Sequence, residues 1–365
     1  MHDTRMTQTS SEAVIARLLL PDDANPAGNV HGGTILRLME EAGMITATRY
    51  MASSFPKSEN GDGNCSIAAL VRFETMSFLK PMFVGEVASL SARIVFTSEH
   101  SVLVEVVVTA EDVSKGKTRV TNSGQLWYVP LAPGGEGTQK DWKQAKVVQV
   151  PQALPPKDEK GRKEYEAAKM QYEKRKSLQN GDNEATSLEC LGLDKFRAEY
   201  VAPSDGRSPS ESEQVLCQIV LPGDCGKGGV AFGGFVMKLM DNCAGCSAFR
   251  HCRTNVVTVA ISAMDFVGWI KLGDLCTIKS KVVFCSAKSL EIEVVASVSS
   301  ASAIGEEATV AKGLFSFVSI GTDGKALAVP PLRLETEEDM HAAFLGHQRY
   351  ADAKRARAAR ENNKK

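Results

Sequence analysis

The stretch HGGTILRLMEEAG, residues 31–43, decides the fold because the chain repeats it as FGGFVMKLMDNCA, residues 232–244. When Gly33 is aligned with Gly234, the offset is 201 residues, and both glycines, one leucine and one methionine are identical in the two copies. Several other positions carry conservative pairs, such as Ile with Val and Arg with Lys. A motif that recurs in this way indicates that one structural unit occurs twice.

Landmarks after the motif repeat in the same order. MSFLKPMFVGEV (76–87) matches MDFVGWIKLGDL (264–275) at an offset of 188, and FTSEHSVLVEV (96–106) matches FCSAKSLEIEV (284–294) at the same offset. The change from 201 to 188 places 13 extra residues in the first copy, in the polar loop SSFPKSENGDGN. The sequence therefore predicts a tandem duplication with one loop insertion.

The duplication divides the chain into four parts. We expect a first domain over residues 10–135, a linker over 136–205, a second domain over 206–330 and a charged helical tail over 331–365. Within the linker, residues 157–182 alternate acidic and basic side chains with few apolar ones, which is typical of a solvated helix.

Each domain has the pattern of an α+β fold. A short strand and a Gly-Gly turn precede about twenty residues that are apolar on almost every side, and a helix of this kind is buried. Four runs rich in β-branched residues follow, joined by short polar connections such as SEH and SKGK, as in antiparallel hairpins. The pattern predicts an antiparallel β-sheet that wraps one long central helix.

Composition excludes several classes of protein. The 365 residues include 43 Lys and Arg against 44 Asp and Glu, a net charge of -1, and 43% hydrophobic residues. A disordered chain or a basic nucleic-acid binder has a different balance, and no apolar run reaches the roughly 18 residues of a membrane span. The nine cysteines and the absence of a signal-peptide pattern lead us to expect reduced thiols in a cytoplasmic protein without nucleic-acid or membrane partners.

The repeated segments carry a family resemblance. PDDANPAGNVHGGTILRLMEEAG (21–43) and LPGDCGKGGVAFGGFVMKLMDNCAG (221–245) resemble the motif at the start of the helix in hotdog-fold acyl-CoA thioesterases, and the tandem arrangement is similar to that of cytosolic members. The resemblance implies two hotdog domains paired as a double hotdog. It also implies hydrolysis of medium- to long-chain acyl-CoA, of the palmitoyl-CoA hydrolase type, without a cofactor. Three such chains are expected to form a homo-oligomer, a hexamer of hotdog domains.

Asp241 is the first candidate catalytic residue. A carboxylate in the apolar context VMKLMDNCAG is costly to bury unless it is paired or its pKa is raised, and this favours a base or a nucleophile. A charge that faces solvent is the alternative. The resemblance implies that the helix carboxylate is the general base, and Glu40 is the aligned residue of the first copy.

The resemblance places the second catalytic residue at Asn25, which would either hold the attacking water or polarise the carbonyl. Its counterpart in the second copy is Gly226. In a hotdog pair the loop of one unit meets the helix of the other, so we expect one composite site with Asn25 and Asp241 and a second with Gly226 and Glu40. Only the first is expected to be active. For Asn25 alone, formation of a turn is the alternative.

Weaker candidates complete the prediction. Backbone N–H groups at Gly33 and Gly234 would face the oxyanion at a helix N-terminus, unless these glycines only allow the helix to pack closely on the sheet. Two matching hairpin turns are candidates for CoA phosphate contacts, with solvated turns as the alternative; their residues are His100, Ser101, Lys288 and Ser289. No metal site is expected, because Cys243-x-x-Cys246 has only partial ligand spacing.

Two other functions remain open from the sequence. A hotdog dehydratase would need a catalytic histidine on the helix or just before it; His31 stands there, but Phe232 replaces it in the repeat, which favours a packing role. A non-catalytic acyl-CoA sensor would lack Asn25 or Asp241, and neither is missing.

Overall fold

A computed structural model describes most of the chain. The described residues are 11–25, 28–52, 67–134, 141–153, 155–156, 158–179, 185–226, 228–300 and 306–362. The loop insertion inferred at SSFPKSENGDGN, residues 53–64, lies outside them.

Both halves contain the predicted elements in the same order, and the expected linker adds one strand that was not predicted, β7, which pairs with β6 of the first half. The first half comprises β1 (Ala13–Leu18), η2 (Pro21–Asp23), α1 (Gly32–Met51), β2 (Ile67–Phe73), β3 (Met76–Ser77), β4 (Val87–Thr97), β5 (Val102–Asp112), β6 (Lys117–Gly134) and β7 (Asp141–Val147). The second half comprises β8 (Gln214–Ile219), η3 (Pro222–Asp224), α5 (Gly233–Cys252), β9 (Asn255–Ile261), β10 (Met264–Phe266), β11 (Leu275–Cys285), β12 (Ser289–Ser299) and β13 (Ala308–Ile320). The remaining helices are α2 (Glu159–Gln179), α3 (Ala185–Glu199), α4 (Pro209–Ser212) and α6 (Glu337–Asn362).

The two halves join into one antiparallel sheet. Over the described residues its strand order is β1-β4-β5-β6-β2-β10-β13-β12-β11-β8, with β3 paired to β9. The junction is reciprocal, since β2 of the first half pairs with β10 of the second while β3 of the first pairs with β9 of the second. This pairing gives the double hotdog that the sequence predicts.

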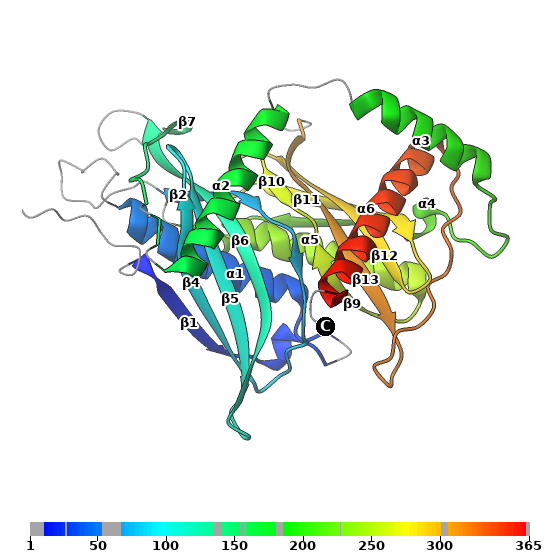
Figure 1. Ribbon diagram of the computed structural model, residues 1–365, viewed down its shortest axis with the longest axis horizontal. Coiled ribbons are helices and arrows are strands. Elements are labelled where there is room, and N and C mark those ends of the chain that lie inside the picture. The colour runs from blue at the N-terminus through cyan, green and yellow to red at the C-terminus, as the bar shows by residue number, and fades with distance from the viewer. Residues whose placement is uncertain are drawn as a thin grey trace, which may run out of the picture.

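The sheet wraps α1 and α5, which pack side by side in the middle of the molecule (Figure 1). Their buried side chains and those of both half-sheets form one continuous apolar core. The helices approach each other most closely at their starts, because a Cβ atom at Gly33 would lie 2.9 Å from Cα of Lys238 and one at Gly234 would lie 2.9 Å from Cα of Arg37. These glycines therefore permit contact between two helices, not the contact of helix with sheet considered from the sequence.

The charged linker helix is packed, in contrast to the solvated helix expected from its composition. α2 crosses the outer face of the first half-sheet (Figure 1). Its Tyr165 ring lies 5.2 Å from the Phe96 ring, and the Arg175 guanidinium lies 4.5 Å above the Trp127 ring. Tyr165, Ala168 and Tyr172 lie on one side of α2 and join the sheet residues in a small cluster that holds the helix.

α6 covers the equivalent outer face of the second half. Tyr350 stacks at 5.6 Å on Phe284, the counterpart of Phe96 at the offset of 188. Asp339 forms a 2.7 Å ion pair with Lys281. Each half-sheet thus has a central helix on its inner face and a later helix on its outer face.

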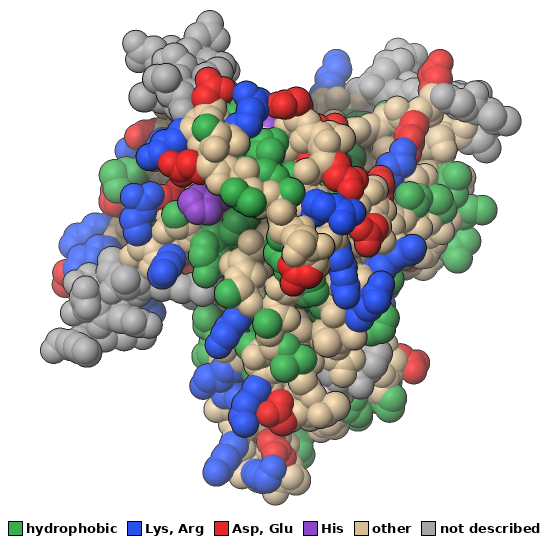
Figure 2. Space-filling view, turned by 90° about the vertical axis from the view of Figure 1, so that its right-hand side faces the viewer, with side chains coloured by type: hydrophobic (Ala, Val, Ile, Leu, Met, Phe, Trp, Pro, Cys, Tyr) green, Lys and Arg blue, Asp and Glu red, His purple; other side chains and the backbone are tan. Residues whose placement is uncertain are grey.

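The surface carries both signs of charge. Basic and acidic side chains lie beside one another over the face shown in Figure 2, in line with the net charge of -1. Among the described residues no helix is long and apolar enough to span a membrane.

Candidate active site

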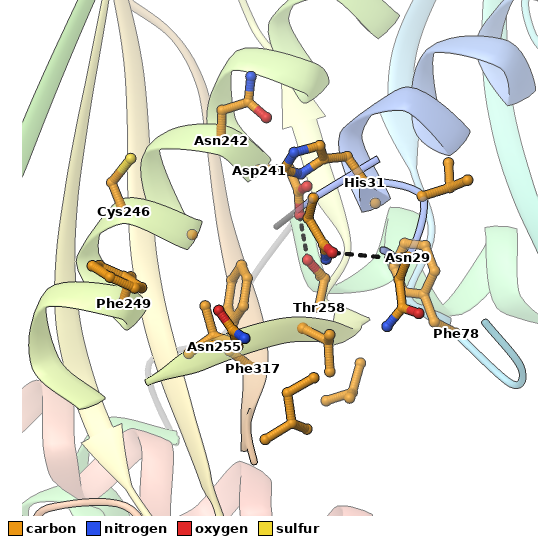
Figure 3. A pocket seen from close by; sticks show the side chains of 18 of the residues that line it. Asn29, His31, Phe78, Asp241, Asn242, Cys246, Phe249, Asn255, Thr258 and Phe317 are labelled. Atoms are coloured by element: carbon orange, nitrogen blue, oxygen red, sulfur yellow. Dashed lines mark hydrogen bonds between the residues drawn. The ribbon is translucent and has the colours of Figure 1, made fainter. Parts of the chain in front are cut away.

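A cavity of about 1940 Å³ opens where the two halves meet. Its walls come from the loop before α1, the segment between β3 and β4, helix α5 and strand β9, so that both repeats contribute (Figure 3). Asn25 and Asp241, which the sequence assigned to one composite site, both line this cavity. His31 and Thr258 lie on the same wall as Asp241.

The Asp241 carboxylate is buried and held at both oxygens. Its Oδ2 accepts a 2.7 Å hydrogen bond from the backbone N–H of Gly33, and its Oδ1 accepts a 2.8 Å bond from the Thr258 hydroxyl. Loss of solvation raises the pKa of Asp241, and this rise is partly offset by Thr258, Gly33 and nearby His31. A fixed carboxylate with a raised pKa is suited to accept a proton near neutral pH.

Asn25 lies in the loop between η2 and α1, where it also closes a turn. Its backbone N–H donates to the Asn29 carbonyl at 2.7 Å, and its side-chain Oδ1 accepts the Asn29 N–H at 3.1 Å. Since the oxygen accepts this bond, the amide NH₂ is the donor end of the side chain. The turn considered as an alternative role is present, and it also orients the amide.

The glycine N–H groups have a different neighbour from the one expected. The Gly33 N–H donates to Asp241, so in this structure it orients the carboxylate and does not face an open oxyanion site. The equivalent N–H of Gly234 is hydrogen-bonded to the Glu40 carboxyl group. The two glycines thus have matching roles in the two halves, each beside the acidic side chain of the other half.

Glu40 and Gly226 line a second, smaller cavity of about 500 Å³. Glu40 is only 2% exposed, and its Oε2 has no hydrogen-bond partner among the described residues. Burial, together with the neighbouring charge of Glu41, raises the pKa of Glu40 to about 8. A Cβ atom at Gly226 would lie 3.1 Å from the Phe232 ring, so a side chain at this position requires the ring to shift by a few tenths of an ångström.

Sequence reasoning missed Thr258. At the offset of 188 its counterpart is Leu70, which packs in the second cavity at the place where Thr258 binds Asp241 in the first. A threonine within a strand does not by itself indicate a site. The exchange of a polar residue in one repeat for an apolar residue in the other was the only sequence feature that could have pointed to Thr258. His31, assigned to packing, lies near enough to Asp241 to lower the pKa of that carboxyl group.

The hairpin-turn candidates are not brought to either cavity. The turn residues His100, Ser101, Lys288 and Ser289 are absent from both linings over the described chain. Their serines instead close the turns, with Ser98 and Ser101 hydroxyls 2.6 Å apart and Ser286 and Ser289 hydroxyls 2.7 Å apart. No group of three His, Cys, Asp or Glu side chains in the described parts is placed to hold a metal ion.

Known proteins match the chain at several levels. A solved acyl-CoA hydrolase from Staphylococcus aureus, in complex with butyryl coenzyme A, aligns with 43% of this chain and 95% of its own, with 25% identity and a TM-score of 0.40. The sequence model described as Thioesterase superfamily matches residues 27–117 and 228–299.

Curated relatives match nearly the whole length. The human cytosolic acyl coenzyme A thioester hydrolase is 38% identical over 348 residues, which cover 94% of this chain and 84% of the human protein. Its rat equivalent is 39% identical over 347 residues, 94% of this chain and 83% of the rat protein. With this identity and coverage, and with the hotdog fold in both halves, the chain belongs to the acyl coenzyme A thioester hydrolase family of the thioesterase superfamily.

Proposed function

We propose that the protein hydrolyses medium- to long-chain fatty acyl-CoA, palmitoyl-CoA included, to free fatty acid and CoA. The reaction takes place in the cavity that Asn25 and Asp241 line. The observation that carries the proposal is the buried Asp241 carboxylate, fixed by Gly33 and Thr258 in a cavity formed by both repeats. The names of the relatives, which are acyl coenzyme A thioester hydrolases, support the same substrate class.

The chemistry requires a base and a donor to the oxyanion. Asp241 accepts a proton from a water molecule as that water attacks the thioester carbonyl, and its raised pKa favours proton transfer near neutral pH. The Asn25 amide NH₂ donates to the carbonyl oxygen as negative charge develops there. The proton then passes to the departing CoA sulfur, and Asp241 is ready for another cycle.

The size and charge of the first cavity support a CoA ester with a long acyl chain. Its volume of about 1940 Å³ exceeds the roughly 300–1,000 Å³ of common ligand pockets. Cationic side chains on its lining can pair with CoA phosphates; they are Lys80, Arg207, Lys238, Arg250 and Arg253. These residues replace the hairpin-turn side chains as our proposed phosphate contacts.

A thiol-release assay tests the proposal. Purified protein, given acyl-CoA of increasing chain length, should release free CoA with an optimum among medium and long chains. A metal chelator should leave the rate unchanged. If no chain length releases thiol faster than the buffer alone, or if the chelator abolishes activity, the proposal is wrong.

We further propose that three chains assemble, as the family resemblance implies. The two edge strands support an interface, since β1 and β8 end the sheet on opposite sides and expose equivalent apolar residues. Val14 and Leu18 of β1 are 71% and 51% exposed, and Val215 and Ile219 of β8 are 58% and 56% exposed. Contact between β1 of one chain and β8 of the next is head-to-tail, and head-to-tail contacts can close a ring. Light scattering should give a trimer, and a stable monomer at micromolar concentration would refute it.

A cytoplasmic location is the remaining proposal. It is supported by the names of the relatives, which are called cytosolic. Fractionation of cells that express the protein should recover it with cytoplasmic markers, and recovery with a membrane fraction would contradict the proposal.

A further inference from the structure

The second cavity has the character of a lipid site. Its lining is mainly apolar and includes Met44, Val236, Phe266 and Trp269. Its volume of about 500 Å³ lies within the range of small-molecule pockets. No Lys or Arg side chain is part of its lining over the described residues, whereas five line the first cavity. The charged phosphates of CoA therefore have cationic partners on the lining of the first cavity and none on the described part of the second lining.

One polar group belongs to this apolar lining. Glu40, Met44 and Thr48 follow each other at intervals of four residues on one face of α1, and all three line the cavity. The Glu40 carboxyl group is buried with one oxygen lacking a partner among the described residues. A buried polar atom without a partner destabilises the fold, and a ligand that forms a hydrogen bond with it removes this cost.

We propose that the second cavity binds, without hydrolysing it, a single-chain lipid whose head is an uncharged carbonyl group, with the carbonyl hydrogen-bonded to Glu40 and the chain along Met44 and Thr48. The carboxyl group can donate this bond because burial raises the pKa of Glu40 to about 8, so that it keeps its proton at neutral pH. Hydrolysis does not follow, because Gly226 and Leu70 supply neither the amide nor the hydroxyl found in the first cavity.

Tryptophan fluorescence tests the proposal, with methyl 12-bromododecanoate as a quenching probe. Trp269 lines the second cavity, whereas the first has no tryptophan on its described lining. We expect saturable quenching in the full-length protein and loss of most of it in Trp269→Phe. Millimolar free CoA should not displace the probe. Absence of saturable quenching, equal quenching in Trp269→Phe, or displacement by CoA would each overturn the proposal.

A cavity-filling variant separates this site from surface adsorption. Phe249 is the counterpart of Thr48 at the offset of 201, so Thr48→Phe copies a side chain that the fold accepts in α5. We expect Thr48→Phe to weaken probe binding at least tenfold. The matched variant Val113→Phe, at an exposed position next to β5, should bind like the unmodified protein. Equal affinity in both variants would refute the site. Thiol release tests the hydrolase proposal independently of this result.

Discussion

The two cavities occupy equivalent places in a duplicated fold, yet their chemistry differs at every position that could support hydrolysis. The first combines an aspartate with a threonine, an asparagine and a histidine, and the second has Glu40, Leu70, Gly226 and Phe232 at the aligned positions. Only the acidic character is retained. When one member of a buried hydrogen-bonded cluster is lost, the remaining polar side chains lack partners. Substitution of these side chains by apolar ones then becomes favourable. Duplication therefore permits one cavity to specialise while its partner loses the polar groups together.

The sharpest test of the contrast between the cavities is to replace their polar side chains one at a time. Asp241→Asn should lower kcat by about 10²- to 10⁴-fold, because it removes the proposed general base. Asn25→Ala should lose most activity as well, through loss of the proposed oxyanion donor. Glu40→Gln should retain a large part of the activity. Thiol release with palmitoyl-CoA, at matched protein concentration, measures all three variants.

Folding must be compared in the same variants. Asp241→Asn and Asn25→Ala should unfold at temperatures close to that of the unmodified protein. Asparagine has the size of aspartate, and Asn25 is only partly buried. A Glu40→Gln variant as inactive as Asp241→Asn would show that the second cavity takes part in catalysis, and the contrast between the cavities would fail.

The pH dependence of stability gives a second test. Glu40 keeps its proton in the folded state up to a pKa of about 8 but loses it near 4.5 in the unfolded state. Between these values the folded state binds more protons, so the free energy of unfolding falls as pH rises, by about 1.4 kcal/mol for each unit of the shift. Glu40→Gln removes this pH dependence. The difference in free energy of unfolding between Glu40→Gln and the unmodified protein should therefore be a few kcal/mol more favourable to the variant at pH 8 than at pH 5.

Denaturant unfolding at several pH values measures this difference. Glu41→Gln, one residue further along the same helix, is the matched control; it removes only the smaller contribution of Glu41 to the raised pKa of Glu40, so its slope should be close to that of the unmodified protein. If the free energy of unfolding of Glu40→Gln changes with pH as that of the unmodified protein does, Glu40 is ionised in the folded state and the second cavity is not neutral.

Placing the groups of the first cavity in the second would test whether their absence makes the second cavity inactive, as we propose. In an Asp241→Asn background, the combination Glu40→Asp, Gly226→Asn, Leu70→Thr and Phe232→His copies the first cavity. We expect thiol release at least tenfold above that background. Leaving Phe232 unchanged should abolish the gain, because its ring lies 3.1 Å from a Cβ atom at Gly226. Equal activity with and without the Phe232→His change would contradict this steric account.

Much of this architecture follows from local sequence patterns. The repeat of the Gly-Gly motif predicted two buried helices, and the change of offset located the loop insertion. Asn25 and Asp241 line one cavity. The sequence patterns located each residue in its own repeat, but their pairing came from the resemblance to hotdog thioesterases, in which the loop of one unit meets the helix of the other. The catalytic roles of the two residues stay predictions.

Features that depend on distant contacts were harder to infer. Alternating charge concealed the side of α2 that carries Tyr165 and Tyr172, although their spacing places them on one face of a helix. The register between β2 and β10 joins residues almost 200 positions apart, as in the pair Asp265 and Arg72. Thr258 gains significance only through the Asp241 carboxylate, which lies on another element.

The smallest effect that we expect from a difference between the two cavities is that of the Thr258 hydroxyl. Thr258→Val keeps the shape of the side chain but removes a hydrogen bond that lowers the pKa of Asp241. The pKa of Asp241 should therefore rise, and the acidic limb of the kcat/KM profile should move to higher pH. Hydrogen bonds to charged groups contribute about 1.5–3 kcal/mol, so we expect about a tenfold loss near neutral pH, with partial recovery at higher pH. Thr258→Ser should restore the profile, and Leu70→Val, at the equivalent position, should not move it. A uniform loss at all pH values, unrelieved by serine, would mean that Thr258 only supports packing.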